Sequence, residues 1–260
     1  MSGTQLTLIQ IDNYGPWTVS PGPRAEPDLQ ALQARLFADI SQFVNTHRGY
    51  VFFTRFDNMI AVTNGMESTD YRRLQESIGN RYPVSISLCS ARDPSPATAL
   101  ARATAELQAA GSAQDGARRE VLTIVDGPAD SHRAQDVTVA HFDVIDATTR
   151  YTDQVTAYES FMEINQAFDS LMRHLYREHD GLAFFVGGDN AIAICPDLPA
   201  EAYRSTIDHV REETGVPLQV GVGSGRRAGD AGMEAKHALE RCRAEANPVH
   251  LASAKTRTGD

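Results

Sequence analysis

The sequence contains very little lysine, few cysteines and no long apolar run, and each shortage excludes a class of protein. Only Lys236 and Lys255 are lysines among the 24 basic residues, and the 34 acidic residues bring the net charge to −10. A nucleic-acid backbone needs a basic stripe, so no nucleic-acid partner is expected. An acidic, arginine-rich composition suits both a high-salt cytosol and a GC-rich genome, and both explanations stay open.

No apolar run approaches the roughly 18 residues that a membrane-spanning helix needs, and the first residues lack the basic and apolar pattern of a signal peptide. We therefore expect no membrane partner and a cytoplasmic location. The three cysteines, Cys89, Cys195 and Cys242, show no paired spacing. They are interpreted as small core residues rather than as disulfides or zinc ligands.

One hairpin pattern occurs twice in the chain. Residues 51–63, VFFTRFDNMIAVT, align without a gap on residues 183–195, AFFVGGDNAIAIC. Each bend carries an Asp-Asn pair, which is Asp57-Asn58 in the first copy and Asp189-Asn190 in the second. A hairpin turn favours Gly, Asn and Asp because they tolerate positive φ, so a purely structural aspartate is the first interpretation to weigh.

The glycines of the second bend argue against that interpretation. Gly187 and Gly188 are replaced by Arg55 and Phe56 in the first copy, whereas the Asp-Asn pair recurs. The part of the bend that recurs in both copies is thus the Asp-Asn pair and not the glycines. The aspartate at the bend is therefore predicted to have a function.

The repeat extends on both sides of the hairpins. Residues 6–18, LTLIQIDNYGPWT, match residues 136–149, DVTVAHFDVIDATT, which aligns Asp12 with Asp143. Further paired segments have helical or strand periodicity: 27–49 with 158–181, 82–90 with 216–225, and 97–111 with 230–244. Both long helical segments end at a glycine, the usual residue after a helix C-terminus.

These matches predict an α+β chain of two tandem ferredoxin-like units, each of the β-α-β-β-α-β palm type with an antiparallel sheet and helices on one face. We assign residues 1–130 to the first unit and residues 131–260 to the second. Residues 125–136 are predicted to be the linker and residues 247–260 a frayed tail. Each sheet would then keep one uncovered apolar face, which predicts a homo-oligomer.

Two carboxylates of the second copy are the strongest site candidates. Asp143 lies in the apolar run VTVAHFDVI, where an uncompensated carboxylate would cost several kcal/mol. The first strand of such a unit lies beside the hairpin, so Asp143 and Asp189 are expected to converge. Few, hard oxygen ligands suit Mg²⁺, which shares its remaining positions with water and phosphate oxygens. The pattern predicts metal-dependent binding of a nucleoside triphosphate.

Backbone groups supply the rest of the predicted phosphate site. Gly187 and Gly188 would let the bend approach a ligand closely. The turns at 146–149 and 13–18 precede helices and offer free N–H groups to a phosphate. The first copy is a weaker candidate because bulky Arg55 and Phe56 occupy its bend.

The strand aspartate, the Gly-Gly-Asp bend and the following VGVGSG resemble the palm-type nucleotidyl cyclases, including the GGDEF diguanylate cyclases and the class III adenylyl cyclases. The tandem of two such units, with QIDNYGPWTVSPGPR, TRFDN, QESIGNRYP, GSAQD and FFVGGDN, resembles the archaeal GTP cyclohydrolase III family over nearly the whole chain. That resemblance implies Mg²⁺-dependent hydrolysis of GTP to 2-amino-5-formylamino-6-ribosylamino-pyrimidinone 5′-phosphate, a precursor of riboflavin and deazaflavin cofactors, with release of inorganic phosphate.

The resemblance also implies roles for individual residues. Asp143 and Asp189 would be the catalytic, metal-binding carboxylates, and Val144 would add its carbonyl. The candidate nucleotide-binding residues are Asp12, Asn13, Arg55, Asp57, Asn58, Gly187, Gly188 and Asn190. Asn190 stands where GGDEF proteins have a second acid, which disfavours a cyclase.

Four other side chains allow both a functional and a structural interpretation. His141 is on the same strand face as Asp143, so it is a candidate general base, but a strand histidine is more often structural. Asp146 is a second acid near the metal or a helix cap. Arg55 is a phosphate clamp or a solvated residue, and Trp17 stacks on a base or fills the core.

Three functional classes follow from these observations. The first is the ring-opening GTP hydrolase, the second a nucleotidyl cyclase, and the third a non-catalytic nucleotide sensor in which Asp189 only completes a turn. No Cys-His cluster with zinc-like spacing is present, so zinc-dependent removal of the formyl group is not expected.

Overall fold

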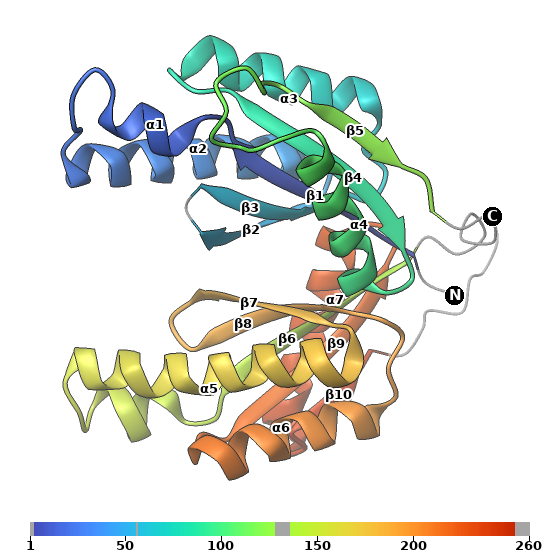
Figure 1. Cartoon of the computed structure of the whole chain (residues 1–260). Helices are drawn as coiled ribbons and strands as arrows, with labels where there is room; N and C mark the ends of the chain where they lie inside the picture. The colour runs from blue at the N-terminus through green and yellow to red at the C-terminus, as the bar shows by residue number, and fades with distance from the viewer. Residues whose placement is uncertain (1–2, 56, 128–135, 253–260) are drawn as a thin grey trace. The chain divides into compact units, whose positions relative to one another are not determined.

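The computed structural model describes residues 3–55, 57–127 and 136–252, which form two compact units (Figure 1). Each unit is built on one five-stranded sheet. In both sheets the first strand of the unit is central, and the hairpin strands lie on one side of it. The α+β prediction is therefore confirmed.

The first unit has the strand order β2-β3-β1-β4-β5. Its elements along the chain are β1 (Thr4–Ile11), α1 (Tyr14–Val19), α2 (Glu26–Thr46), β2 (Tyr50–Arg55), β3 (Asn58–Val62), α3 (Ser68–Arg81), β4 (Ile86–Asp93), α4 (Pro96–Ala109) and β5 (Leu122–Val125).

The second unit repeats this order as β10-β9-β6-β8-β7. Its elements are β6 (Val137–Val144), a π-helical turn (Thr148–Thr152), α5 (Ala157–His179), β7 (Leu182–Gly187), β8 (Asn190–Cys195), α6 (Ala200–Thr214), β9 (Leu218–Gly225), α7 (Ala228–Glu245) and β10 (Val249–Leu251).

The fifth strand of each sheet departs from the predicted plan. β5 pairs parallel to β4 and β10 pairs parallel to β9, whereas the other neighbours are antiparallel. The predicted frayed tail is wrong for Val249–Leu251, because these residues form β10. The predicted linker also begins too early, since Val125 is the last residue of β5. Residues 128–135 and 253–260 lie outside the described part of the chain.

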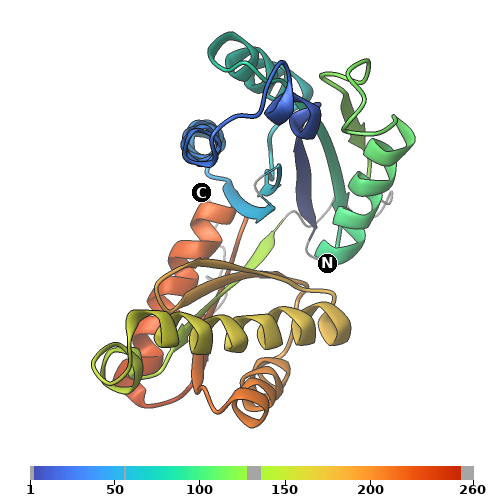
Figure 2. The ribbon, with the colours of Figure 1, turned by 60° about the vertical axis from the view of Figure 1, so that its left-hand side comes forward.

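Each sheet carries helices on both of its faces, with one helix over part of the second face, which corrects the prediction of helices on one face (Figure 2). In the first unit α2 and α3 pack their buried side chains on one face, and α4 contacts β1 and β4. In the second unit α5 and α6 enclose the core, and α7 lies against β9. Over β1, β4 and β9 the face expected to be uncovered therefore carries a helix, and the homo-oligomer stays a prediction with that support reduced.

The α5 helix illustrates how local sequence sets an element. Thr156 and Glu159 form a reciprocal capping box at its start, which satisfies backbone N–H groups of the first turn. Ile164, Phe168, Leu171 and Leu175 follow at spacings of four and three and are buried in the core. The capping residues thus define where α5 begins, and the apolar spacing defines which side faces the sheet.

The glycines predicted as helix terminators have a different role. The left-handed backbone position after α2 is Arg48, with φ 58°, and after α5 it is Asp180, with φ 52°. Gly49 follows because a Cβ there would lie 2.5 Å from the Val62 carbonyl oxygen. The glycine therefore allows close packing, and the residue before it makes the turn.

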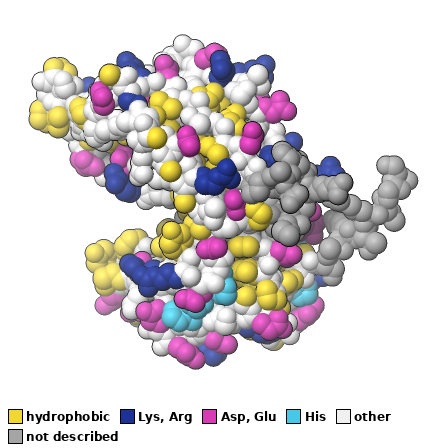
Figure 3. Space-filling model, turned by 45° about the vertical axis from the view of Figure 1, so that its right-hand side comes forward, with side chains coloured by type: hydrophobic (Ala, Val, Ile, Leu, Met, Phe, Trp, Pro, Cys, Tyr) yellow, Lys and Arg dark blue, Asp and Glu magenta, His cyan; other side chains and the backbone are white. Residues whose placement is uncertain are grey.

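The charge distribution on the surface and the burial of the cysteines agree with what the composition led us to expect. On the face in Figure 3, acidic and basic side chains of the described residues are interspersed, and the basic ones form no continuous stripe on that face. Cys89, Cys195 and Cys242 are free and buried, as predicted. No helix in the described ranges is long and apolar enough to cross a membrane.

Replacing Gly223 with Ala should destabilise the second unit. A Cβ at this position would lie 2.4 Å from the Ala231 carbonyl oxygen and the Ala235 amide nitrogen of α7. Because backbone atoms cannot yield as a flexible side chain can, we expect a loss of about 2 kcal/mol or more in the free energy of unfolding. Chemical denaturation measures it. Gly22→Ala is the control, since nothing lies within 4 Å of its Cβ position, and equal effects of the two substitutions would contradict this account.

Candidate active site

A cavity of about 700 Å³ opens in the second unit at the end of β6. It falls within the size range of small-molecule sites. Its walls come from the end of β6 and the turn after it, from the β7–β8 bend, from α6, from the start of β9, and from the last turn of α7 with the residues that follow it. Asp143 and Asp189 both line this cavity, so the structure brings the two predicted carboxylates together.

Asp143 is held in place by two donors. The carboxylate is only 4% exposed, and its Oδ2 accepts hydrogen bonds from Gln219 Nε2 at 2.7 Å and from Arg243 Nη2 at 3.0 Å. These donors account for the buried charge that the sequence left uncompensated. Because both act on Oδ2, the second oxygen of Asp143 is the one better placed to serve a ligand.

The bend that carries Asp189 is fastened to β6 through the backbone. Asp143 pairs with Asn190 across the sheet, and the Val144 amide donates to the Asp189 carbonyl at 3.1 Å. The positive φ angles of the bend belong to Gly187, at 119°, and Gly188, at 63°. Asp189 itself is not among the positive-φ residues, so the turn does not require an aspartate there.

The two glycines therefore serve the bend conformation. A Cβ at either Gly187 or Gly188 would meet nothing within 4 Å, so close packing does not demand glycine at these positions. Positive φ does, because other residues are strained there. Their predicted contact with a nucleotide stays a prediction.

Asn190 links His141 to Asp189. Asn190 Nδ2 donates to Asp189 Oδ1 at 2.7 Å. This orientation turns the Asn190 Oδ1 toward His141 Nε2, which lies 2.8 Å away. Nε2 must then carry the proton, and only Nδ1 of the neutral ring keeps a lone pair. Burial lowers the pKa of His141, although the Asn190 hydrogen bond and the charge of Asp143 raise it. The geometry fits His141 as a residue that positions Asp189 through Asn190.

The turn after β6 forms another wall of the cavity. Asp146 has a positive φ of 56°, and Ala147, Thr148 and Thr149 line the cavity beside it. The expected helix start is a five-residue π-helical turn that begins at Thr148, with Ala147 at its N-cap position. Asp146 is therefore not a helix cap, which was one of the two roles that the sequence allowed.

The cavity is also lined by two arginines that the sequence analysis did not single out. Arg211 comes from α6, where it pairs with Asp208 at 2.9 Å, and Arg243 comes from α7. The hydrogen bond to Asp143 raises the pKa of the Arg243 guanidinium, so that group stays charged. Neither arginine belongs to a motif, and only the packing of α6 and α7 brings them to the end of β6.

The donors around the cavity fit a hard cation better than zinc. In the described ranges of the chain no three His, Cys, Asp or Glu side chains are grouped as a metal cluster. The predicted ligand residues Asp143, Val144 and Asp189 all line the cavity, and so do Asp146 and Asp208, the latter in its ion pair with Arg211. Such a small oxygen set suits Mg²⁺, which keeps several of its waters.

The first unit differs from the alignment made on sequence. Gln10 pairs with Asn58, as Asp143 pairs with Asn190, so Gln10 is the counterpart of Asp143. The backbone agrees, because the Ile11 amide donates to the Asp57 carbonyl at 3.0 Å, as Val144 does to Asp189. The alignment of Asp12 with Asp143 is therefore wrong by two residues. Asp12 corresponds to Ile145.

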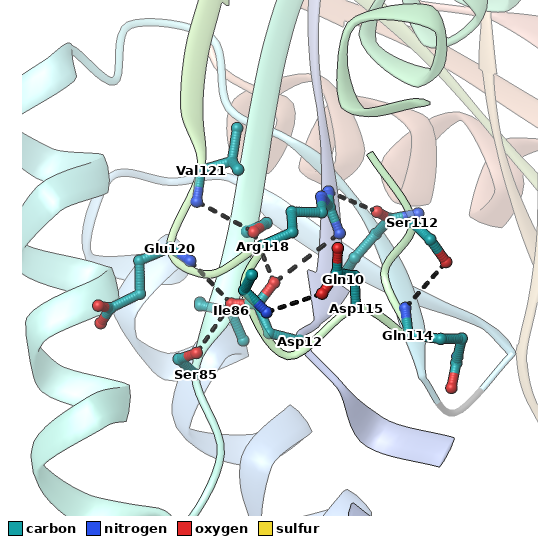
Figure 4. A network of polar contacts seen from close by, with 12 residues as sticks. Gln10, Asp12, Ser85, Ile86, Ser112, Gln114, Asp115, Arg118, Glu120 and Val121 are labelled. Carbon is teal, nitrogen blue, oxygen red and sulfur yellow. Dashed lines mark hydrogen bonds and ion pairs between the residues drawn. The ribbon is translucent and has the colours of Figure 1, made fainter. Parts of the chain in front are cut away.

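Asp12 lies in a buried polar network, in which Nε and Nη1 of Arg118 have no hydrogen-bond partner among the described residues (Figure 4). It is 4% exposed, and its carboxylate accepts hydrogen bonds from Ser85 Oγ at 2.8 Å, Ser87 Oγ at 2.6 Å and the Glu120 amide at 2.9 Å. Arg118 Nη1 lies 3.9 Å from it. Donors from the protein itself thus surround this carboxylate.

The other predicted residues of the first unit are near its strand ends. Arg55 makes a bidentate ion pair with Asp57, at 2.7 and 3.2 Å. Asn13 has a positive φ of 52°, as its counterpart Asp146 does, and Asn58 begins β3. Trp17 packs against the core of the first unit, with the Arg24 guanidinium 3.9 Å above its ring. Phe56 lies outside the described residues.

Fold and cavity together define a tandem palm-type α+β protein with an acidic site in its second unit. The family model described as GTP cyclohydrolase III matches residues 6–256. The GTP cyclohydrolase III of Natronomonas pharaonis is 55% identical over 97% of this chain and 100% of its own length. GTP cyclohydrolase III 1 of Halobacterium salinarum is 56% identical, covering 92% of this chain and 94% of its own, and the Methanocaldococcus jannaschii GTP cyclohydrolase III is 43% identical, covering 92% and 88%.

Among solved structures, the GGEEF domain of a diguanylate cyclase from Vibrio cholerae matches with a TM-score of 0.39 and 14% identity, over 46% of this chain and 85% of that chain. The chain belongs to the GTP cyclohydrolase III family and is an enzyme of that family.

The pKa of His141 predicts a pH-dependent stability. Since burial lowers it below the ordinary 6.5, the unfolded chain binds a proton that the folded chain lacks once the pH falls below 6.5. Stability should therefore fall with decreasing pH across that range. His141→Gln should flatten the difference in the free energy of unfolding between about pH 7.5 and 5.5. An unchanged slope in the variant would show that His141 does not bear on this pH dependence.

Proposed function

We propose that the chain binds GTP with Mg²⁺ in the cavity of its second unit. GTP would be hydrolysed there to the formylamino-pyrimidinone ribonucleotide 5′-phosphate and inorganic phosphate. The names of the curated relatives support GTP as the substrate. The observation that carries the proposal is one cavity lined both by carboxylates and by guanidinium groups. The carboxylates are Asp143 and Asp189, with Asp146 and Asp208 beside them, and the guanidinium groups are Arg211 and Arg243. Carboxylates attract a divalent cation and arginines attract phosphate oxygens, so the charges match a metal triphosphate.

Asp143, Asp189 and the Val144 carbonyl would hold the metal. When bound, Mg²⁺ supplies Lewis-acid polarisation of phosphoryl oxygens. Arg243 is 47% exposed and pairs with Asp143 through Nη2 and with Glu240 through Nη1, so phosphate would bind the exposed part of its guanidinium. The backbone of the turn at Ala147–Thr149 offers further phosphate donors along the same wall.

The proposed reaction consumes water at two kinds of bond. A water adds at C8 of guanine and the C8–N9 bond breaks, so that C8 stays on N7 as a formyl group and N9 keeps the ribosyl group. Further water cleaves the phosphate anhydrides, releasing the β and γ phosphates. His141 is proposed to orient the Asp189 carboxylate through Asn190, since its Nε2 already donates to the Asn190 amide oxygen.

The direct test is incubation of the pure protein with GTP and Mg²⁺, followed by ultraviolet spectroscopy and phosphate assay. Ring opening would change the purine spectrum and release orthophosphate. An intact purine spectrum with pyrophosphate release would indicate a nucleotidyl cyclase instead, and neither signal would indicate a nucleotide sensor.

Asp189→Asn tests the carboxylate at the bend. The backbone of residue 189 needs no special φ, so stability should hold or rise when a half-buried anion that needs a metal is removed. Turnover should fall a hundredfold or more, on the order of 3 kcal/mol in transition-state free energy. Asp57→Asn at the matching bend of the first unit should have the smaller effect on turnover. A variant at 189 that melts earlier and keeps its turnover would leave the aspartate a structural role only.

Metal dependence is the second test of the proposed function. Because the oxygen donors of the cavity favour hard cations, activity should require Mg²⁺ or Mn²⁺ and should survive zinc-selective chelation. Steady-state rates before and after each chelator measure this. If activity were lost when zinc is removed and restored by zinc alone, the proposed oxygen ligands would be contradicted.

A further inference from the structure

The two units differ most where the last helix returns to the last strand. In the first unit residues 110–121 connect α4 to β5, whereas in the second unit only residues 246–248 connect α7 to β10. The short connection forms part of the cavity wall through Ala246, Asn247 and Pro248. Its long counterpart has enough chain to fold over the corresponding strand end of the first unit.

That long connection binds polar groups at the strand end of the first unit. Its Ala113 carbonyl accepts a hydrogen bond from the Asn13 amide at 2.7 Å, at the start of the turn after β1. The Glu120 amide donates to the Asp12 carboxylate, and the Val121 amide donates to Ser87 Oγ at 3.0 Å. Backbone groups of the connection therefore bind both the turn and the acid of the first unit, as Figure 4 shows for Asp12.

Arg118 supplies a cation from within the same connection. It is 6% exposed, donates through Nη2 to Gln10 Oε1 at 3.0 Å and lies 3.9 Å from Asp12. In the second unit the cation beside the strand acid is Arg243, which is 47% exposed and comes from a helix that borders the cavity. The first unit thus holds a buried internal cation where the second has one that a ligand can reach.

The strand and the bend of the first unit both differ from their counterparts in the second unit in whether they present a carboxylate to a ligand. Gln10 stands at the position of Asp143, so the strand carboxylate is absent at that register. At the bend, Arg55 binds both carboxylate oxygens of Asp57, whereas Gly187, the counterpart of Arg55, has no side chain that could pair with Asp189. Neither acid of the pair is therefore presented as it is in the second unit.

We infer that residues 110–121 fill the strand end at which the first unit would otherwise bind a metal nucleotide. The first unit therefore binds none, and each chain has one nucleotide site, in its second unit. The connection provides a cation, Arg118, and a carbonyl acceptor, that of Ala113, where a metal nucleotide would bring a metal ion and phosphate oxygens. The inference rests on the proposed function for the identity of the nucleotide, but the internal occupancy of the first unit does not depend on it.

The test compares one substitution at two strand ends of the full chain. Asp12→Asn and Asp143→Asn each replace a buried carboxylate by an amide of the same shape. Equilibrium dialysis with Mn²⁺ and a non-hydrolysable GTP analogue measures stoichiometry and Kd, and calorimetry measures Tm. The wild-type chain should bind one nucleotide. Asp143→Asn should weaken that binding at least tenfold, whereas Asp12→Asn should lower Tm, because Arg118 loses its carboxylate, and leave one nucleotide bound with an unchanged Kd.

Two nucleotides per wild-type chain, or an Asp12→Asn protein that folds and binds the analogue more weakly, would overturn the inference. If Asp12→Asn does not fold, Asp57→Asn replaces it for the binding measurement, since that residue is in an exposed ion pair. It should again leave one nucleotide per chain, and a lost nucleotide would overturn the inference.

If the wild-type chain binds no nucleotide, the proposed function fails. The Tm of Asp12→Asn then decides the inference alone. A lower Tm supports the internal occupancy of the first unit, and an unchanged Tm overturns it.

Discussion

The candidate site depends on the attachment of the β7–β8 bend to the end of β6. Asp143 faces Asn190 across the sheet, and the hydrogen bond from the Val144 amide to the Asp189 carbonyl closes the pairing beyond that point. A shift of this pairing by one residue would turn every side chain of β6 to the opposite face. Register thus decides that two acids far apart in the chain border one cavity.

Buried charge is the second constraint, and each unit satisfies it differently. Asp143 receives two side-chain donors and still borders open space, because Arg243 reaches it from a partly exposed position. Asp12 receives donors from β4 and from the connection after α4, and these leave it enclosed. An unpaired carboxylate in either place would be expensive, so the difference between the units lies in the source of the donors.

The duplicated scaffold therefore separates folding from function. Both units keep the strand order, the hairpin and the backbone hydrogen bond from the central strand to the bend. What differs is the length of one connection and the side chains at a few strand ends. Connections tolerate changes in length at small entropic cost, so a connection can lengthen without disturbing the sheet it joins.

The sequence by itself determined the α+β class, the duplication and the convergence of Asp143 and Asp189 on one site. Periodicity and the repeated hairpin report local structure, and the antiparallel plan then brings strand end and bend together. The sequence could not set the register of the first unit, because a shift of two residues keeps the same strand face and therefore the same hydrophobic pattern. For this reason the sequence alignment placed Asp12, and not Gln10, opposite Asp143.

Only the tertiary structure decided which other side chains border the cavity. Arg211, Arg243 and Gln219 come from elements far apart in the chain, and their positions follow from how α6, α7 and β9 pack around β6. The same holds for the second face of each sheet, where the glycines of β9 admit the backbone of α7. Local sequence carries no signal for such long-range packing, because it depends on the shape that the whole unit adopts.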